Sequence, residues 1–277
     1  MKVIRNLNEL QKIRKELDSP VGFVPTMGFL HKGHISLVER ARSECQSVVV
    51  SIFVNPTQFG PTEDLDSYPR DLDRDSSLLE SAKTDIVWVP DTNEMYPEGF
   101  QTWVEVTQLT KHLEGVQRPA HFRGVTTIVA KLFNAVQPDK AYFGQKDAQQ
   151  ATVIRRMVKD LNYPIDIVVC PIVREPDGLA LSSRNTYLSP AERKAATVLS
   201  RSLFEAKHLY ENGVHDGPRL KESVLKILQA EPLANVQYVS CADPNTLEEI
   251  DGEFEQCLLS MAVYIGKTRL IDNIQLP

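Results

Sequence analysis

The sequence predicts an α/β fold in two parts: a parallel β-sheet with helices on both faces, followed by a smaller α+β domain. Short apolar runs alternate with helical patterns along the first part of the chain, as in βαβ units with right-handed crossovers. The run VVVSIFV (48–54) is almost wholly apolar, as expected for a strand that is buried on both faces. From Ser189-Pro190 onward, two long helical patterns precede two further strands.

The first elements are a helix, a strand and a second helix. Apolar residues recur at helical spacing over 7–17, and Asp18-Ser19-Pro20 ends this predicted helix. A short apolar strand follows at 21–24. We expect Pro25 to end it, because proline has no N–H for a strand ladder. The pattern becomes helical again from Gly33.

The loop between this strand and helix, PTMGFLHKGH (25–34), has features of a phosphate site. Gly28 and Gly33 allow tight backbone and close approach by a ligand. The N-terminus of the following helix presents N–H groups and a partial positive charge, which suit a phosphate. His31 and His34 lie there, and both can donate hydrogen bonds to charge that develops in phosphoryl or nucleotidyl transfer.

The remaining elements continue the alternation. The turn-rich segment NPTQFGP (55–61) follows the strand at 48–54, at the strand end where open parallel sheets bind ligands. Further strands are predicted at 86–89, 141–143, 165–169, 236–240 and 258–265, an edge strand at 102–106, and helices around 78–82, 125–136, 148–161, 191–212 and 218–229. We place the boundary near Glu175, which gives a Rossmann-like domain over 1–175 and a smaller C-terminal domain over 176–277.

Composition limits the class of protein. The 277 residues are 42% hydrophobic and 25% charged, as in globular proteins. The net charge of −6 argues against a general nucleic-acid binder, though not against a nucleotide enzyme with a local basic pocket. No stretch is long and apolar enough to predict a membrane span or a signal peptide. The four cysteines are far apart, which favours reduced thiols and a cytoplasmic protein.

Two motifs resemble the signatures of the nucleotidylyltransferase superfamily, which class I aminoacyl-tRNA synthetases share. The first is His31-Lys-Gly-His34 between a strand and a helix. The second is Leu181-Ser-Ser-Arg184, which resembles a diverged form of the mobile Lys-Met-Ser-Lys-Ser loop. A cationic side chain there can neutralise a leaving pyrophosphate. An ordinary interdomain linker is the alternative interpretation of this second motif.

A larger set of motifs resembles one family, the pantothenate synthetases (pantoate–β-alanine ligases), in that family's order and spacing over essentially the whole chain. Leu181, Gln145 and Ala148 depart from the residues that are common in the family. The matching motifs are PTMG (25–28), HKGH (31–34), NPTQF (55–59), DSYPR (66–70), HFRGV (121–125), FGQKD (143–147), QQ (149–150) and SSRN (182–185).

The resemblance implies a ligation of pantoate and β-alanine that uses ATP and Mg²⁺. Pantoate and ATP would first give pantoyl adenylate and pyrophosphate, and β-alanine would then displace AMP. Activation of a carboxylate in this way depends on charge stabilisation around the α-phosphate more than on a protein nucleophile. The resemblance also implies a homodimer, and the charge and the lack of a long apolar stretch predict neither a nucleic-acid nor a membrane partner.

The same resemblance assigns residues. Gln58 and Gln150 resemble the pair that holds pantoate, since an amide both donates and accepts; without the resemblance they would be interpreted as solvated loop glutamines. Asp75 resembles a magnesium-associated aspartate, and a solvated acidic helix start is the alternative. The catalytic set is His31, His34, Lys146, Ser182, Ser183 and Arg184, and the ATP-binding set is Met27, His34, Gly144, Lys146, Asp147, Val173, Leu181, Ser182, Ser183 and Arg184.

Two other classes of function stay open at the level of the sequence. A nucleotidyltransferase that makes a dinucleotide or a CDP-alcohol would keep His-x-Gly-His but need not keep Gln58 and Gln150. A non-catalytic nucleotide sensor or RNA-binding relative should have lost donors such as Lys146 or Arg184, or gained a basic surface, and the sequence shows neither change.

Overall fold

The computed structural model describes residues 1–61 and 63–277, which divide into two compact units. The first unit comprises Met1–Gly144 and Gln150–Pro171, and the second comprises Gln145–Gln149 and Ile172–Pro277. The single boundary near Glu175 stays a prediction. The sequence gives no sign that the five residues 145–149 group with the C-terminal part of the chain.

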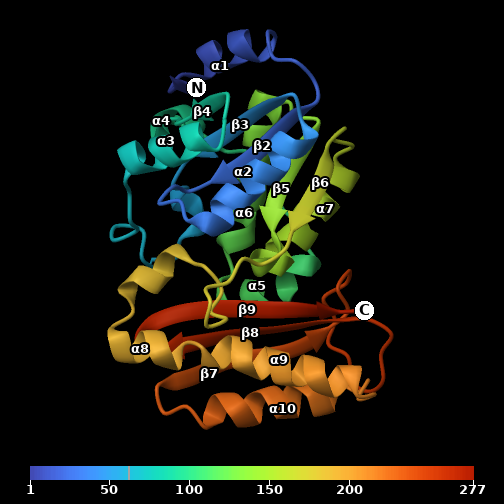
Figure 1. Cartoon of the computed structure of the whole chain (residues 1–277). Coiled ribbons are helices and arrows are strands. Elements are labelled where there is room, and N and C mark those ends of the chain that lie inside the picture. Colours follow the sequence, from blue (N-terminus) through green and yellow to red (C-terminus); the bar gives the residue numbers. More distant parts are fainter. Residues whose placement is uncertain (62) are drawn as a thin grey trace. The chain divides into compact units, whose positions relative to one another are not determined.

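The first unit is built on a six-stranded sheet with the order β1-β4-β3-β2-β5-β6, in which every pairing is parallel (Figure 1). The predicted parallel α/β sheet is therefore confirmed. The three-residue β1 was missed, because so short a run carries no periodicity. The strands are β1 (Lys2–Ile4), β2 (Val21–Thr26), β3 (Ser47–Ile52), β4 (Ile86–Trp88), β5 (Lys140–Gly144) and β6 (Asp166–Cys170).

Each face of this sheet has its own hydrophobic core. Phe23 and Val49 pack with apolar residues of α1, α6 and α7 on one face, whereas Val24 and Val50 pack with α2 and α3 on the other. Neighbouring residues alternate between the two cores because strand side chains have a period of two. The helices are α1 (Leu7–Arg14), α2 (Lys32–Glu44), α3 (Leu72–Ser81), α4 (Thr92–Met95), α5 (Leu113–Gln117), α6 (His121–Val136) and α7 (Ala148–Asp160), with short 3₁₀ turns η1 (Pro56–Gln58) and η2 (Leu109–Lys111).

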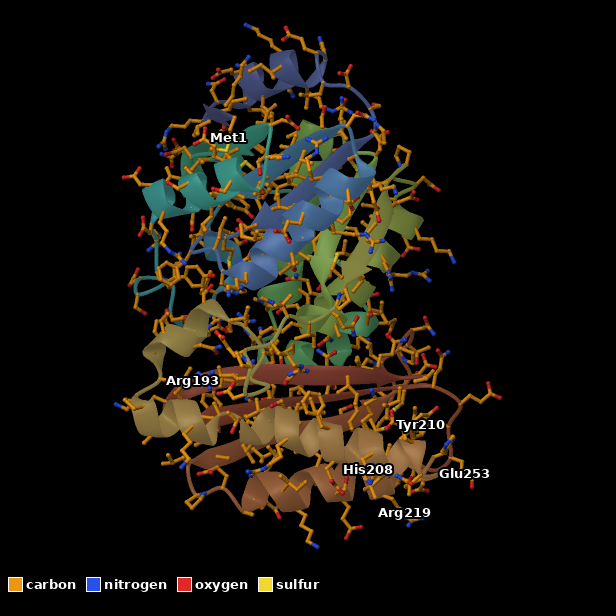
Figure 2. All side chains as sticks on the ribbon, in the orientation of Figure 1. Met1, Arg193, His208, Tyr210, Arg219 and Glu253 are labelled. Carbon is orange, nitrogen blue, oxygen red and sulfur yellow. The ribbon has the colours of Figure 1, made fainter. Side chains whose placement is uncertain are left out.

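The second unit is the smaller α+β structure that the sequence predicts. Its antiparallel sheet has the order β7-β8-β9, and buried leucines of α9 and α10 form one core with residues of β8. His208 of α9 and Arg219 of α10, both labelled in Figure 2, are exposed. The elements are η3 (Gln145–Asp147), η4 (Ser183–Tyr187), α8 (Pro190–Ala195), α9 (Val198–Glu211), α10 (Gly217–Gln229), β7 (Ala234–Ala242), β8 (Cys257–Ile265) and β9 (Thr268–Leu276).

The prediction that Pro25 ends its strand is wrong, since β2 continues to Thr26. The pairing of β2 with β5 covers only Gly22 and Phe23. On the β3 side, the carbonyl of Thr26 accepts from the N–H of Phe53. Because peptide groups alternate in direction along a strand, the nitrogen of Pro25 faces the β5 side beyond the paired residues, where no donor is required.

Two other predictions of local structure are corrected, and one strand was missed. Residues 102–106 form no strand, because threonines of α6 bond their backbone: Val104 N–H donates to Thr127 Oγ1 (3.0 Å), and Thr126 Oγ1 donates to the Val104 carbonyl (2.6 Å). The single helix predicted over 191–212 is divided into α8 and α9. The strand β9 was missed, because Arg269, Asp272 and Asn273 interrupt its apolar pattern. No helix in the described part of the chain is long and apolar enough to cross a membrane.

Candidate active site

The strand order places a candidate site at the centre of the first unit's sheet. From β2, the chain continues to β3 and β4 on one side, and β5 and β6 lie on the other side. Open parallel sheets bind ligands at the carboxyl ends of the strands where the order reverses in this way. The loop after β2 carries Met27 and His31, His34 lies in the first turn of α2, and the loop after β3 carries Gln58. The fold therefore brings these predicted loops to the ends of adjacent strands.

The loop after β2 makes a tight turn that a buried carboxylate holds. Gly28 and Phe29 both have left-handed backbone, with φ of 83° and 48°, which is uncommon for a phenylalanine. Asp75 of α3 is buried, and its two oxygens accept the N–H groups of Phe29 and Leu30, each at 2.7 Å. These two hydrogen bonds offset the conformational cost of the left-handed backbone in the turn immediately before His31.

This geometry bears on the predicted magnesium role of Asp75. Burial raises the pKa of Asp75, and its backbone hydrogen bonds and Arg74 oppose that effect. Both oxygens already accept backbone hydrogen bonds, and the residues that the structure describes contain no group of three or more His, Cys, Asp or Glu side chains that could hold a metal. The metal role stays a prediction, and the structure gives Asp75 a second role that the sequence did not reveal.

His31 and His34 cap the N-terminus of α2 reciprocally. The N–H of Gly33 donates to His31 Nδ1 (3.1 Å), and the N–H of His31 donates to His34 Nδ1 (3.3 Å). The i, i+3 spacing of the motif is thus the spacing of a capping box. Since Nδ1 accepts in both rings, the neutral form of each carries its proton on Nε2. The ring centroids lie 4.0 Å apart, so two Nε2–H donors stand together at a helix N-terminus.

The amide of Gln58 is oriented from both ends. Asn55 Nδ2 donates to Gln58 Oε1 (3.2 Å), and Gln58 Nε2 donates to the sulfur of Met27 (2.9 Å). Asn55 is buried, and its Oδ1 accepts from the hydroxyl of Tyr96 (2.9 Å). No role is predicted for Asn55 from the sequence. Its place directly before a proline, at the end of a buried strand, is the signal that could have drawn attention to it.

A second group of side chains holds the main chain of Gln58. His121 Nδ1 lies 2.8 Å from the Gln58 carbonyl, and Arg118 donates to His121 Nε2 (3.2 Å). A carbonyl only accepts and a guanidinium only donates, so His121 carries its proton on Nδ1 and is neutral. Burial, followed by the charge of Arg118, lowers the pKa of His121 to about 4. Arg118 is itself held by Glu63 (2.8 Å).

The remaining predicted residues are divided between the two units. Gly144 ends β5 and Gln150 lies in the first turn of α7, and both belong to the first unit. Lys146 and Asp147 form η3 in the second unit. Also in the second unit, the N–H of Leu181 donates to the Val173 carbonyl (3.0 Å). Ser182 caps η4 by accepting the N–H of Arg184 (3.3 Å), and Ser183 is buried beside it.

Comparison with known proteins identifies close relatives over the full chain. A family model described as pantoate-beta-alanine ligase matches residues 2–275. Pantothenate synthetases of Roseiflexus castenholzii and Thermotoga petrophila are 56% and 53% identical, over 99% of this chain and 98% and 99% of theirs.

Two solved structures are also similar to this chain. A pantothenate synthetase of Thermus thermophilus has a TM-score of 0.94 at 48% identity, over 99% of both chains. A pantoate-beta-alanine ligase of Francisella tularensis, complexed with Beta-gamma ATP and β-alanine, has a TM-score of 0.80 at 36% identity, over 99% of this chain and 97% of that one.

The role of Asp75 in the turn predicts a loss of stability in Asp75→Asn. The amide keeps one acceptor but turns a donor toward the second N–H, so we expect a loss of about 1–3 kcal/mol in the free energy of unfolding. Asp73→Asn, an exposed change on the same helix, should cost less than about 0.5 kcal/mol. The measurement is urea unfolding without Mg²⁺. Equal stability of the two variants would leave the metal role as the explanation for Asp75.

The neutral state of His121 predicts a pH-dependent stability. The folded pKa of about 4 lies below the ordinary value of 6.5, so below pH 6.5 the unfolded chain binds a proton that the folded chain does not. The stability present above pH 6.5 is therefore lost as the pH falls toward 4. Between pH 7 and pH 5, the wild type should lose roughly 1–2 kcal/mol more than His121→Gln.

The control for this measurement is His208→Gln, which removes an exposed histidine and should follow the wild type. Urea unfolding at the two pH values gives the comparison. If the wild type and His121→Gln lose the same stability, His121 is not held neutral in the folded chain.

Proposed function

The chain belongs to the pantoate–β-alanine ligase family, and on this premise we propose that it joins pantoate and β-alanine to form pantothenate, using ATP. The reaction passes through pantoyl adenylate and releases pyrophosphate and AMP. The observation that carries the proposal is the pair of reciprocally capped histidines at the N-terminus of α2, together with the oriented amide of Gln58 in the loop after the neighbouring strand. The Francisella relative complexed with Beta-gamma ATP and β-alanine supports the same two substrates.

In the first step, a carboxylate oxygen of pantoate attacks the α-phosphorus of ATP, and the bond from that phosphorus to the bridging oxygen breaks. Negative charge develops on the α-phosphate and on the leaving pyrophosphate. We propose that the Nε2–H groups of His31 and His34 donate to this charge, as preorganised donors do in a site of low dielectric. Lys146 and Arg184, with the hydroxyls of Ser182 and Ser183, are proposed to neutralise the triphosphate.

In the second step, the amine of β-alanine attacks the acyl carbon of pantoyl adenylate. The bond from that carbon to the phosphate oxygen breaks, AMP leaves, and the amine nitrogen loses a proton to solvent water. Acyl transfer of this kind needs no protein nucleophile, because adenylation has already supplied a good leaving group. The proposed task of the chain is to hold the intermediate and to keep water away from its acyl carbon.

Recognition of pantoate is proposed for Gln58 and Gln150. The amide of Gln58 is already oriented by Asn55 and Met27, so little conformational freedom is lost when a hydroxyl or carboxylate binds. A site built to bond hydroxyls rejects acids that lack them, because its own polar groups are then left unpaired. This property would separate the chain from nucleotidyltransferases that share only the histidine motif.

The remaining proposals concern ATP, metal, assembly and location. Met27, Gly144, Asp147, Val173 and Leu181 are proposed to line the nucleotide. Mg²⁺ is proposed to accompany the phosphates of ATP, where it would neutralise their charge, and Asp75 stays the proposed magnesium-associated residue. A homodimer is proposed from the family resemblance, and sedimentation equilibrium tests it. A reducing cytoplasm is consistent with four free, buried cysteines.

The direct test of this function is release of pyrophosphate from ATP without β-alanine. With pantoate we expect a rapid burst of about one pyrophosphate per site, because the adenylate forms and stays bound; addition of β-alanine should convert the burst into continuous release. A pantoate analogue without the secondary hydroxyl should give far less. Release that is independent of the acid, or equal for both acids, would overturn the assignment.

If His34 is a hydrogen-bond donor to the α-phosphate, a variant that keeps its capping bond should lose activity without losing stability. His34→Gln keeps a side-chain acceptor for the N–H of His31, because glutamine at this helix position completes a capping box, but it removes the ring Nε2–H. We expect a thermal midpoint near that of the wild type and a fall of about 10²–10³ in the adenylation rate. His34→Ala should lose both stability and rate. Because the glutamine amide can itself donate, near-normal pyrophosphate release by His34→Gln would show only that the imidazole is not required, whereas near-normal release by His34→Ala would exclude the donor role.

A further inference from the structure

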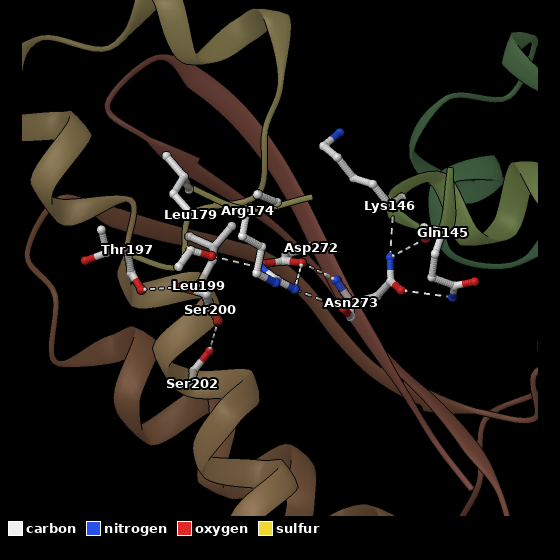
Figure 3. A network of polar contacts seen from close by, with 12 residues as sticks. Gln145, Lys146, Arg174, Leu179, Thr197, Leu199, Ser200, Ser202, Asp272 and Asn273 are labelled. Carbon is white, nitrogen blue, oxygen red and sulfur yellow. Dashed lines mark hydrogen bonds and ion pairs between the residues drawn. The ribbon is translucent and has the colours of Figure 1, made fainter. Parts of the chain in front are cut away.

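Asn273 of β9 holds the turn that carries Lys146. Its Nδ2 donates to the carbonyls of Gln145 (3.0 Å) and Lys146 (2.9 Å), and its Oδ1 accepts from Gln145 Nε2 (3.1 Å). Asn273 is buried, and Figure 3 shows these bonds between β9 and the turn. Only a side-chain amide supplies two donors and an acceptor at the same place, so the residue type is specified by the turn that it holds.

Asn273 is in turn fixed by a buried ion pair. Its N–H donates to Asp272 Oδ1 (2.8 Å), and Arg174 forms a bidentate pair with the Asp272 carboxylate at 2.6 and 2.8 Å. Arg174 also donates to the carbonyl of Gly178 (3.1 Å) and lies over the ring of Phe204 (5.2 Å). A bidentate guanidinium–carboxylate pair has a defined orientation. The pair therefore fixes Asp272, and with it the neighbouring Asn273 on β9.

The two adjacent residues Asp272 and Asn273 therefore anchor two separate segments that are proposed to bind ATP. Arg174 lies in the hairpin in which Val173 and Leu181 pair, and Lys146 lies in the turn at 145–147. The strand before this turn belongs to the first unit, yet residues 145–149 group with the second. The three side-chain hydrogen bonds of Asn273 give a physical reason for that grouping.

A lysine depends on its main chain for placement. Its ammonium is a point charge on a flexible stem, and a misplacement of about 1 Å can reduce a rate by about 10². We propose that Asn273 is a positioning residue for Lys146 in the adenylation step, and that the Arg174–Asp272 pair keeps Asn273 in place. This proposal rests on the function proposed above and adds a residue that no motif in the sequence indicated.

The first test compares half-reactions in Asn273→Asp. The carboxylate keeps an acceptor for Gln145 but presents oxygens to two carbonyls, so it should displace the turn. We expect kcat/KM for ATP in pyrophosphate release to fall at least 10-fold, and the attack of β-alanine on supplied pantoyl adenylate to stay within about twofold of the wild type. Gln275→Ala, an exposed change on the same strand, should leave both half-reactions unchanged. An equal loss in both half-reactions would show a merely structural role and overturn the proposal.

The second test asks whether Asn273 acts through Lys146. In the Lys146→Ala background, Asn273→Asp should cause little further loss of adenylation, because the ammonium that Asn273 positions is already absent. The effects of residues that act through one another are non-additive. Full additivity would overturn the proposal. If Asn273→Asp does not fold, Gln145→Ala takes its place in both tests, since it removes only the bond to Asn273 Oδ1. We expect a loss of about 2–5-fold for that variant, and no loss would overturn the proposal.

The wild type separates this proposal from the proposed function. Absence of pantoate-dependent pyrophosphate release in the wild type would refute the function itself. Normal release in the wild type, together with normal release in Asn273→Asp, would refute only the positioning role of Asn273.

Discussion

The pair of hydrogen bonds from Phe29 and Leu30 to the buried carboxylate of Asp75 is the interaction on which the candidate site depends most. Phe29 occupies a left-handed conformation that a side chain with Cβ disfavours by roughly 1–3 kcal/mol. Two charge-assisted bonds, at about 1.5–3 kcal/mol each, are sufficient to offset that cost. The turn fixes the start of α2, and the start of α2 fixes the histidines. A helix on one face of the sheet thus determines the geometry of a loop above the strand ends.

The loop after β3 obeys a different constraint, which is the close approach of backbone to backbone. A Cβ on Gly124 would lie 2.4 Å from the carbonyl oxygen of Thr57, so only glycine lets the first turn of α6 pack against η1. Asn55 then bonds the carbonyl of Gly124 (3.1 Å) and the amide of Gln58 together. His121 and Arg118, from the start of the same helix and the residues before it, hold the carbonyl of Gln58. The HFRG motif is therefore the support of the NPTQ motif, and the two are parts of one structure.

The overall architecture could be predicted from the sequence for physical reasons. Strands buried on both faces leave apolar runs, and amphipathic helices leave a 3.6-residue period, so the parallel sheet and its helices could be predicted. The errors fall where side chains override periodicity. Threonines of α6 form hydrogen bonds with the backbone of the segment at 102–106. The polar residues of β9 interrupt its apolar pattern because two of them, Asp272 and Asn273, bind Arg174 and Gln145. Pro25 was misjudged because the pairing partner on each side of β2 is not visible in the sequence.

The candidate site likewise contains residues that the sequence reveals and residues that only the structure reveals. Residues proposed to touch substrate, such as His31, His34 and Gln58, stand in motifs, because chemistry restricts their type and spacing. Two residues that hold the backbone of the site are remote in sequence: Asp75 bonds the loop before His31, 45 and 46 positions away, and Asn273 bonds the turn of Lys146, 127 and 128 positions away. Their partners are backbone groups, which every residue has, so no residue type in the sequence indicates the contact. A polar residue that satisfies distant N–H or C=O groups can be recognised only when the fold shows which backbone it faces, so remote positioning residues such as Asp75 and Asn273 emerge from the structure alone.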